Sequence, residues 1–220
     1  MSALEITVRG RAERQYRPEQ GTVTLAASFT EPTSESAHAK ALALQSEVVA
    51  ELTRLDETDA LNTWHANDIH VFGHRPWVDG KQSRKVLYTT RIAMTAEFLD
   101  FEALAAFLVD WAGRDGLTVG HIAWDVRVEN RRSYEVDVRR EAVGDAVAKA
   151  QAYADAVGRG TVVAVALADP DMLGTAPNES VGPMMMRAAG ADMGAGPTLE
   201  LRPDDVVIAA AVDARFTASD

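Results

Sequence analysis

The amino-acid sequence predicts an α+β protein whose helices pack on a twisted, mainly antiparallel sheet. Several short segments alternate apolar and polar side chains, which is the period of a strand with one face in water. Other segments repeat apolar residues every three or four positions, which is the period of an amphipathic helix. From Gly21 to Asp125 these patterns follow in the order strand, helix, strand, strand, helix, strand. That order predicts a ferredoxin-like split β-α-β unit.

The first two strands are predicted to form a hairpin. Apolar residues from Leu4 to Ala12 alternate with charged ones, and a second alternating segment runs from Val23 to Phe29. A turn near Pro18 separates the two segments. We therefore expect the first strand to extend the sheet as an N-terminal hairpin strand paired with the second.

Two helices and a second hairpin complete the predicted unit. Between Ala37 and Leu55 apolar residues recur at helical spacing and give one stripe that faces the core. Asp100 is a typical N-cap for a shorter helix that follows the fourth strand. The Asp79-Gly80 pair indicates a tight reversal between the third and fourth strands. Trp77 lies in that reversal, and we expect it to be the most exposed of the four tryptophans.

The C-terminal part predicts a third helix and two further strands. The helix is expected over about 133–157, with an apolar stripe formed by Val143, Val147, Ala150, Ala154 and Val157. The apolar run Val162–Ala168 is typical of a strand covered on both faces, and Val206–Phe216 predicts the last strand. The segment at about 169–203 is rich in Gly, Pro and Met and predicts a long loop. We expect residues 1–220 to form a single domain.

Composition and charge exclude several classes of function. The 220 residues include 22 basic and 33 acidic side chains, for a formal net charge of −11, so nucleic acid would be repelled. No apolar run is long enough to span a membrane, and Met1–Glu5 lacks the layout of a secretory signal. We therefore expect a cytoplasmic protein. The absence of cysteine excludes disulfides and thiolate chemistry.

Short sequence pieces along nearly the whole chain resemble the SIMPL-domain family. The pieces are Ile6-Thr7-Val8-Arg9-Gly10, Pro18, Thr22-Val23-Thr24-Leu25, Asp68-Ile69, Tyr88-Thr89-Thr90-Arg91, Ala142-Val143, Lys149-Ala150-Gln151-Ala152-Tyr153-Ala154 and Gly158. The resemblance implies an α/β fold with a twisted sheet backed by helices, and self-association into rings or larger assemblies in some members. It also implies stress-related or signalling-adaptor roles, but no catalytic residues. Many bacterial relatives are exported or located at the outer membrane, but because Met1–Glu5 does not resemble a leader peptide we do not expect a periplasmic or channel-like role for this chain.

A candidate metal site lies on the predicted third strand. Asp68, His70 and His74 occupy alternate positions, so they share one side of the strand, and two imidazoles with a carboxylate are ligands for zinc, nickel or copper. Solvated polar residues on the wet face of a strand explain the same pattern. We therefore assign no metal and no cofactor.

A candidate anion site lies where the third helix begins. Five arginines cluster there, and the amides at a helix N-terminus favour phosphate-like groups. The arginines are Arg127, Arg131, Arg132, Arg139 and Arg140. Interleaved acidic residues nearly cancel their charge, so we favour an ion-paired surface.

Methionines in the long loop are candidates for protein interaction. Thioether side chains adapt to irregular apolar surfaces, so a loop rich in them is suited to docking another protein, or to folding over its own sheet edge. The residues are Met184, Met185, Met186 and Met193. We expect a non-enzymatic protein that works by self-association as a homo-oligomer or by binding a protein partner. The alternative is a metal- or anion-binding protein or enzyme that uses the Asp/His or Arg clusters.

Overall fold

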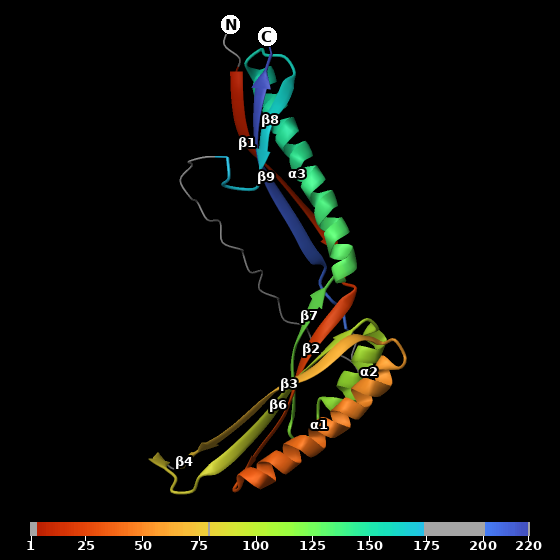
Figure 1. Cartoon of the computed structure of the whole chain (residues 1–220), viewed down its shortest axis with the longest axis vertical. Coiled ribbons are helices and arrows are strands. Elements are labelled where there is room, and N and C mark those ends of the chain that lie inside the picture. Colours follow the sequence, from red (N-terminus) through yellow and green to blue (C-terminus); the bar gives the residue numbers. More distant parts are fainter. Residues whose placement is uncertain (1–3, 79, 174–200, 220) are drawn as a thin grey trace, which may run out of the picture. The chain divides into compact units, whose positions relative to one another are not determined.

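The computed structural model of the chain describes residues 4–78, 80–173 and 201–219 (Figure 1). The described elements confirm the predicted α+β class, since helices pack on antiparallel sheets. They divide into two compact units. One unit contains β2 to β7 with α1 and α2, and the other contains β1, α3, β8 and β9.

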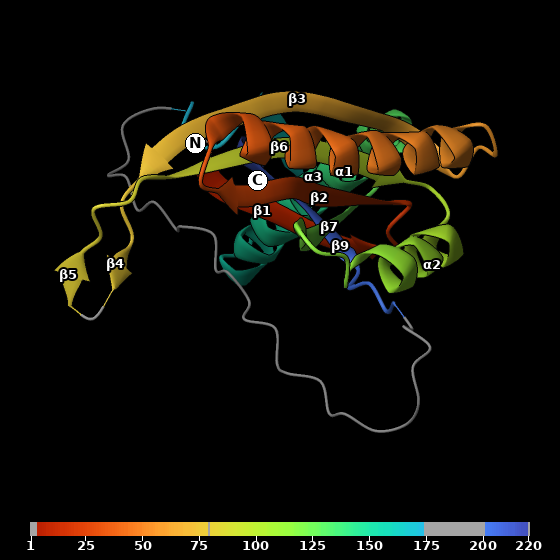
Figure 2. The same ribbon diagram turned by 90° about the horizontal axis from the view of Figure 1, so that it is seen from below.

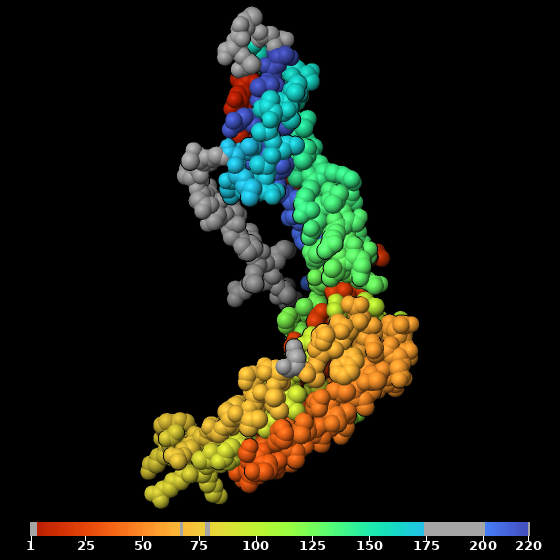
Figure 3. Space-filling view, in the orientation of Figure 1, coloured from red at the N-terminus to blue at the C-terminus, as the bar shows by residue number. Residues whose placement is uncertain are grey.

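The first unit is a four-stranded sheet with the strand order β3-β6-β2-β7, in which all neighbours are antiparallel. Its elements are β2 (Gln20–Glu31), α1 (Ser34–Asp56), β3 (Leu61–His74), β6 (Leu87–Phe98), α2 (Phe101–Trp111) and β7 (Leu117–Asp125). Helix α1 connects β2 to β3, but these two strands are not neighbours in the sheet. Strand β6 lies between them. Two short strands, β4 (Trp77–Val78) and β5 (Lys81–Gln82), lie between β3 and β6 and project away from the helices (Figures 2 and 3).

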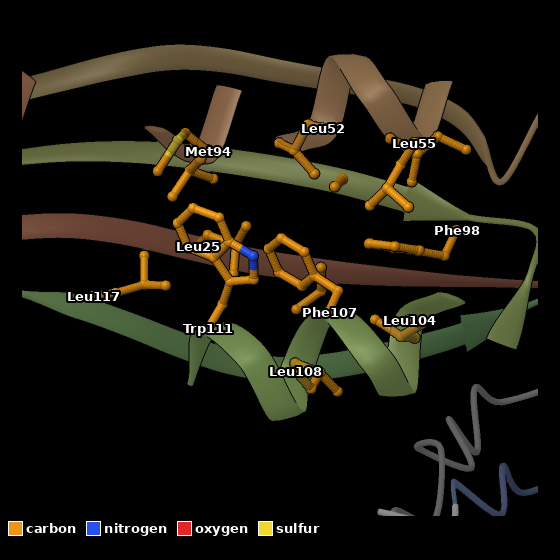
Figure 4. Close-up of a cluster of buried hydrophobic side chains, with 14 of the residues drawn as sticks. Leu25, Leu52, Leu55, Met94, Phe98, Leu104, Phe107, Leu108, Trp111 and Leu117 are labelled. Atoms are coloured by element: carbon orange, nitrogen blue, oxygen red, sulfur yellow. The ribbon is translucent and has the colours of Figure 1, made fainter. Parts of the chain in front are cut away.

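The core of this unit lies between one face of the sheet and the two helices. Leu52 and Leu55 of α1 and Phe107 and Trp111 of α2 point toward Leu25 on β2 (Figure 4). Side-chain caps determine where α1 and α2 begin. Thr33 accepts a hydrogen bond from the Ser36 amide, and Asp100 accepts two, from the Glu102 and Ala103 amides at 2.8 and 3.1 Å. The capping role predicted for Asp100 is thus confirmed.

The second unit is a three-stranded antiparallel sheet with the order β1-β9-β8, packed on one long helix. Its elements are β1 (Leu4–Tyr16), α3 (Val128–Ala156), β8 (Val162–Ala168) and β9 (Val206–Ala218). The first and last strands pair along 13 positions, from Leu4 opposite Ala218 to Tyr16 opposite Val206.

The predicted N-terminal hairpin is therefore wrong. Strand β1 pairs with β9 and not with β2, whose two edges are occupied by β6 and β7. Alternation shows that a segment is a strand and which side chains share a face, but it carries no information about the partner strand. The nearest strand in sequence was the wrong choice because its hydrogen-bonding groups are already paired within the other sheet.

The buried stripe of α3 also differs from the predicted one. The buried residues recur every four positions: Val138, Ala142, Ala146, Ala150 and Ala154. Val147 and Val157, which were expected in the stripe, are 42% and 62% exposed. A step of four residues advances about 40° beyond one full turn of an α-helix, so this stripe winds around the helix axis. The prediction assumed a stripe parallel to the helix axis. It therefore included exposed residues toward both ends of the stripe.

Helix α3 touches β1 most closely at Gly10. A Cβ built on Gly10 would lie 2.0 Å from the Ala142 carbonyl oxygen and 2.8 Å from the Ala146 Cβ, so only glycine fits. Polar contacts flank this approach. The Asp145 carboxylate accepts a hydrogen bond from the Arg11 amide at 2.8 Å, and the Lys149 ammonium donates to the Arg9 carbonyl at 3.1 Å and to Asp145 at 2.6 Å.

The sheet face opposite α3 carries an ion-pair network. The Arg9 guanidinium donates to both carboxylate oxygens of Asp213, at 2.6 and 2.9 Å, and to Asp171 at 2.7 Å. The Asp171 amide also donates to Asp213, at 2.7 Å. Hydrogen bonds from Arg9 hold the pKa of the Asp213 carboxyl below its usual value, although partial burial opposes that shift. The network ties β1 and β9 to the chain that follows β8.

Replacing Gly10 by alanine is expected to destabilise the fold by about 1 to 3 kcal/mol, because the added methyl group would overlap the backbone of α3. Urea unfolding followed by far-UV circular dichroism measures the effect. The matched control is Gly144→Ala within α3, where a Cβ meets no atom within 4 Å, and which should stabilise by about 0.5 to 1 kcal/mol. Equal midpoints for both variants would contradict the close-contact interpretation.

The free energy of unfolding is expected to fall as the pH drops below about 4. A carboxyl whose pKa is lowered by folding stabilises the protein above its unfolded pKa of about 3.9, and this stabilisation is lost as the pH falls through the folded value. The Asp213→Asn variant should be less stable at pH 7 and should lose less stability between pH 5 and 2. Asp110→Asn, on the exposed face of α2, is the control. Parallel pH profiles for Asp213→Asn and the unmodified protein would rule out this role.

Candidate interaction surfaces

The predicted metal residues lie on one face of β3, but only two of them meet. The pairing register with β6 places Asp68, His70 and His74 on the same side of the strand. His70 Nε2 lies 2.9 Å from Asp68 Oδ2, whereas the His74 ring packs near Phe72, with centroids 5.9 Å apart. No group of three or more His, Asp or Glu side chains forms a metal-binding arrangement among the described residues. A histidine and a carboxylate alone supply half of the ligands of a closed tetrahedral site.

The arginines at the start of α3 have acidic neighbours in ion-pair range. Arg127 pairs with Glu129 at 3.4 Å, Arg139 with Glu135 at 3.2 Å, and Arg140 with Asp137 at 3.1 Å. These contacts agree with the ion-paired interpretation. Arg131, Glu135 and Arg139 also line a depression of about 290 Å³ against the first residues of β9. Its lining includes a carboxylate beside two guanidinium groups, which opposes anion binding there.

A concavity of about 510 Å³ lies along the β1–β9 ribbon. It is lined by Arg11, Ala12 and Glu13 of β1 and by Ala209, Ala210 and Ala211 of β9. Short alanine side chains create the hollow. A ligand site normally brings several polar groups together over an apolar floor, and here the polar side chains are one arginine and one glutamate.

Strand β8 forms an apolar edge of its sheet. The sequence run Val162–Ala168 was expected to be covered on both faces, and this prediction is wrong. Val163, Val165 and Leu167 are 61%, 54% and 52% exposed. β8 pairs with β9 on one side, lies at the end of the strand order, and makes few contacts with α3. An uninterrupted apolar run indicates a strand, but it cannot distinguish a central strand from an uncovered edge.

The other strands that end the two larger sheets carry charged side chains. Strand β1 has glutamate and arginine at alternating positions, β3 has Asp68, and β7 ends at Asp125. Charged residues on an edge oppose the addition of a further strand. Among these four edges β8 alone lacks a charged residue.

The end of the β3–β6 hairpin combines exposed aromatic and basic residues. Trp77 is 71% exposed, which confirms its predicted exposure, and Phe72 is 52% exposed. Four exposed basic residues surround them: Arg75, Lys81, Arg84 and Lys85. The sequence carries this signal, four cations within eleven positions around a tryptophan, but the turn pattern of the same residues assigns no function to it.

The predicted docking residues Met184, Met185, Met186 and Met193 lie outside the described residues. Their role in protein interaction stays a prediction.

Comparison with known proteins places the chain in a family. The model of the SIMPL family, described as a protein of unknown function (DUF541), matches residues 6–216. No curated protein matched the chain. In the described part of the chain, no helix combines the length and apolar character needed to cross a membrane. Two of the segments that carry the resemblance, Ile6–Gly10 and the helical residues from Ala142 to Ala154, are the two sides of the β1–α3 contact. The match spans almost the entire sequence, and the chain therefore belongs to the SIMPL family.

Proposed function

We propose that this chain is a non-enzymatic SIMPL-domain protein that works by self-association, and that strand β8 is the surface through which two copies meet. The observation that carries the proposal is the exposed apolar edge Val162–Ala168. An edge strand presents a row of main-chain N–H and C=O groups on its outer side, and an extended segment can pair with them.

A second copy of β8 suits this edge. The strand contains only valine, alanine and leucine, so two such strands meet without repulsion between like charges and without burying a charge. An antiparallel pair around a two-fold axis places the same surface on both sides of the interface. Each copy therefore contributes the same strand, β8, and no second surface of different sequence is required.

A β-bulge limits the length of such a pairing. The register between β8 and β9 shifts between Ala164 and Ala166, which leaves Val165 without a partner in β9 and bends the strand. The exposed side chains of Val163 and Leu167 lie on either side of this bulge. Because the bulge interrupts the outer hydrogen-bonding row, apolar side-chain contact supplies much of the proposed association. Substitution of these side chains is therefore the appropriate test.

The chain is expected to show a mass above 23.7 kDa that increases with protein concentration in light scattering after size exclusion. Val163→Lys combined with Leu167→Lys should restore the monomer mass, since pairing would bury two ammonium groups. Val128→Lys combined with Val147→Lys is the matched control, because both valines are exposed on α3, at 66% and 42%, and neither belongs to β8. The control should associate as the unmodified chain does.

Deletion of residues 174–200 separates β8 from the predicted methionine docking segment. Association that survives the deletion and is lost in the β8 lysine variant supports the β8 surface. Association that is lost in the deletion and survives in the β8 lysine variant contradicts it and favours the methionines. A strict monomer at all concentrations would rule out self-association through either segment.

A further inference from the structure

The hairpin arm is defined here as residues 74–87, which join β3 to β6 and include β4 and β5. Outside the arm, β3 and β6 are joined in the sheet by β2, which pairs with β6 as far as Glu31 opposite Tyr88. Within the arm only β4 and β5 pair with each other, through Trp77 with Gln82 and Val78 with Lys81. Figure 3 shows this part of the chain extending as a narrow projection past the helical layer of its unit. Its side chains therefore meet solvent on most sides.

The arm is positively charged on a negatively charged protein. It contains Arg75, Lys81, Arg84 and Lys85 against the single acidic residue Asp79, for a net charge of +3, whereas the whole chain carries −11. All four basic side chains belong to exposed residues. Among the described residues, none of the four has an acidic side chain within ion-pair distance. In the described part of the chain, the basic residues of the arm therefore lack the acidic neighbours that pair with Arg127, Arg139 and Arg140.

Apolar side chains accompany the positive charge. Trp77 is 71% exposed, and the end of β3 that leads into the arm exposes Ile69, Val71 and Phe72 by about half. One exposed apolar residue is ordinary on a protein surface, but here four lie within nine positions of the chain, with Ile69 and Val71 on one face of β3 and Phe72 on the other. Tryptophan prefers the boundary between water and lipid, where its ring is buried and its N–H remains hydrated.

We propose that the hairpin arm binds the surface of an anionic phospholipid bilayer, with Trp77 in the headgroup region and the basic side chains against lipid phosphates. Each lysine or arginine near such a surface contributes about 1 kcal/mol, which is about fivefold in binding. A fluid lipid interface accepts an exposed indole without a preformed groove. A protein partner would have to provide a pocket for the indole ring.

The length of the arm lets it reach an anionic surface despite the surplus of acidic residues in the remainder of its own unit. About seven residues on each side of the hairpin, at about 3.3 Å per residue, give a reach of up to about 20 Å. The Debye length at physiological salt is about 8 Å, so repulsion between the remainder of this unit and the bilayer is largely screened at that distance. The attraction of the arm acts at contact, where screening is weakest.

Co-sedimentation of the full chain with vesicles tests the proposal. Vesicles of 70% phosphatidylcholine and 30% phosphatidylglycerol should carry the protein down at 0.1 M salt, and vesicles of phosphatidylcholine alone should not. The variant Lys81→Gln, Arg84→Gln, Lys85→Gln should lower the partition coefficient about 100-fold, since three fivefold contributions are removed. Trp77→Ala should lower it about tenfold or more, because it removes a large apolar ring.

The matched control is Arg132→Gln, Arg139→Gln, Arg140→Gln on α3, which changes the net charge equally in the other unit and should bind as the unmodified chain does. The β8 variant Val163→Lys with Leu167→Lys should also keep its lipid binding, so the outcome is independent of self-association. A sample without vesicles detects sedimentation of the protein alone. Failure to bind the anionic vesicles overturns the proposal, as does equal binding by the arm variants. Binding to polyglutamate but not to the vesicles would overturn it in favour of an acidic protein partner.

Discussion

The close approach of α3 to β1 at Gly10 is the contact on which the second unit depends. The absence of a side chain there lets the backbone of the helix lie against the strand, and the small residues Ala142 and Ala146 complete the fit. The contact joins the beginning of the chain to a helix more than 130 positions later. It therefore brings β1 to the sheet that contains β9, and the first and last strands pair along their whole lengths. The family resemblance in these two segments thus has a packing basis.

The same arrangement explains why β8 is an edge. Strand β9 already has β1 on one side, so β8 occupies its other side and ends the sheet. The contact of α3 is concentrated on β1 and β9, and its alanine stripe leaves most of β8 uncovered. An apolar sequence at an uncovered edge conflicts with the usual protection of edges by charge, and this conflict is itself informative. The proposed self-association would relieve this conflict, because pairing through β8 would cover the exposed valines.

Local patterns predicted the local elements of this protein, and long-range pairing was where they failed. The stripe from Ala37 to Leu55 and the Asp100 cap depend on neighbouring residues, so sequence spacing was sufficient for both. The partner of β1 depends on a strand about 200 positions away, and alternation cannot identify it. The exposure of Val163 likewise depends on which strand lies beside β8. The prediction of candidate sites had the same limit. His74 lies on the same face of β3 as Asp68, but its ring lies near Phe72 and does not join Asp68 and His70 in one cluster.

The two proposed surfaces also differ in their physical character, which argues that they serve different contacts. The β8 edge has no charge and offers main-chain groups in a row, so it suits a partner of the same extended geometry. The hairpin arm combines dense positive charge with an exposed indole and lacks a regular edge of comparable length, so it suits a charged interface that needs no fixed shape. Raising the salt concentration weakens contacts between exposed charges and leaves apolar strand contacts in place. Ionic strength is therefore the variable that would separate the proposed lipid binding from the proposed self-association in one preparation.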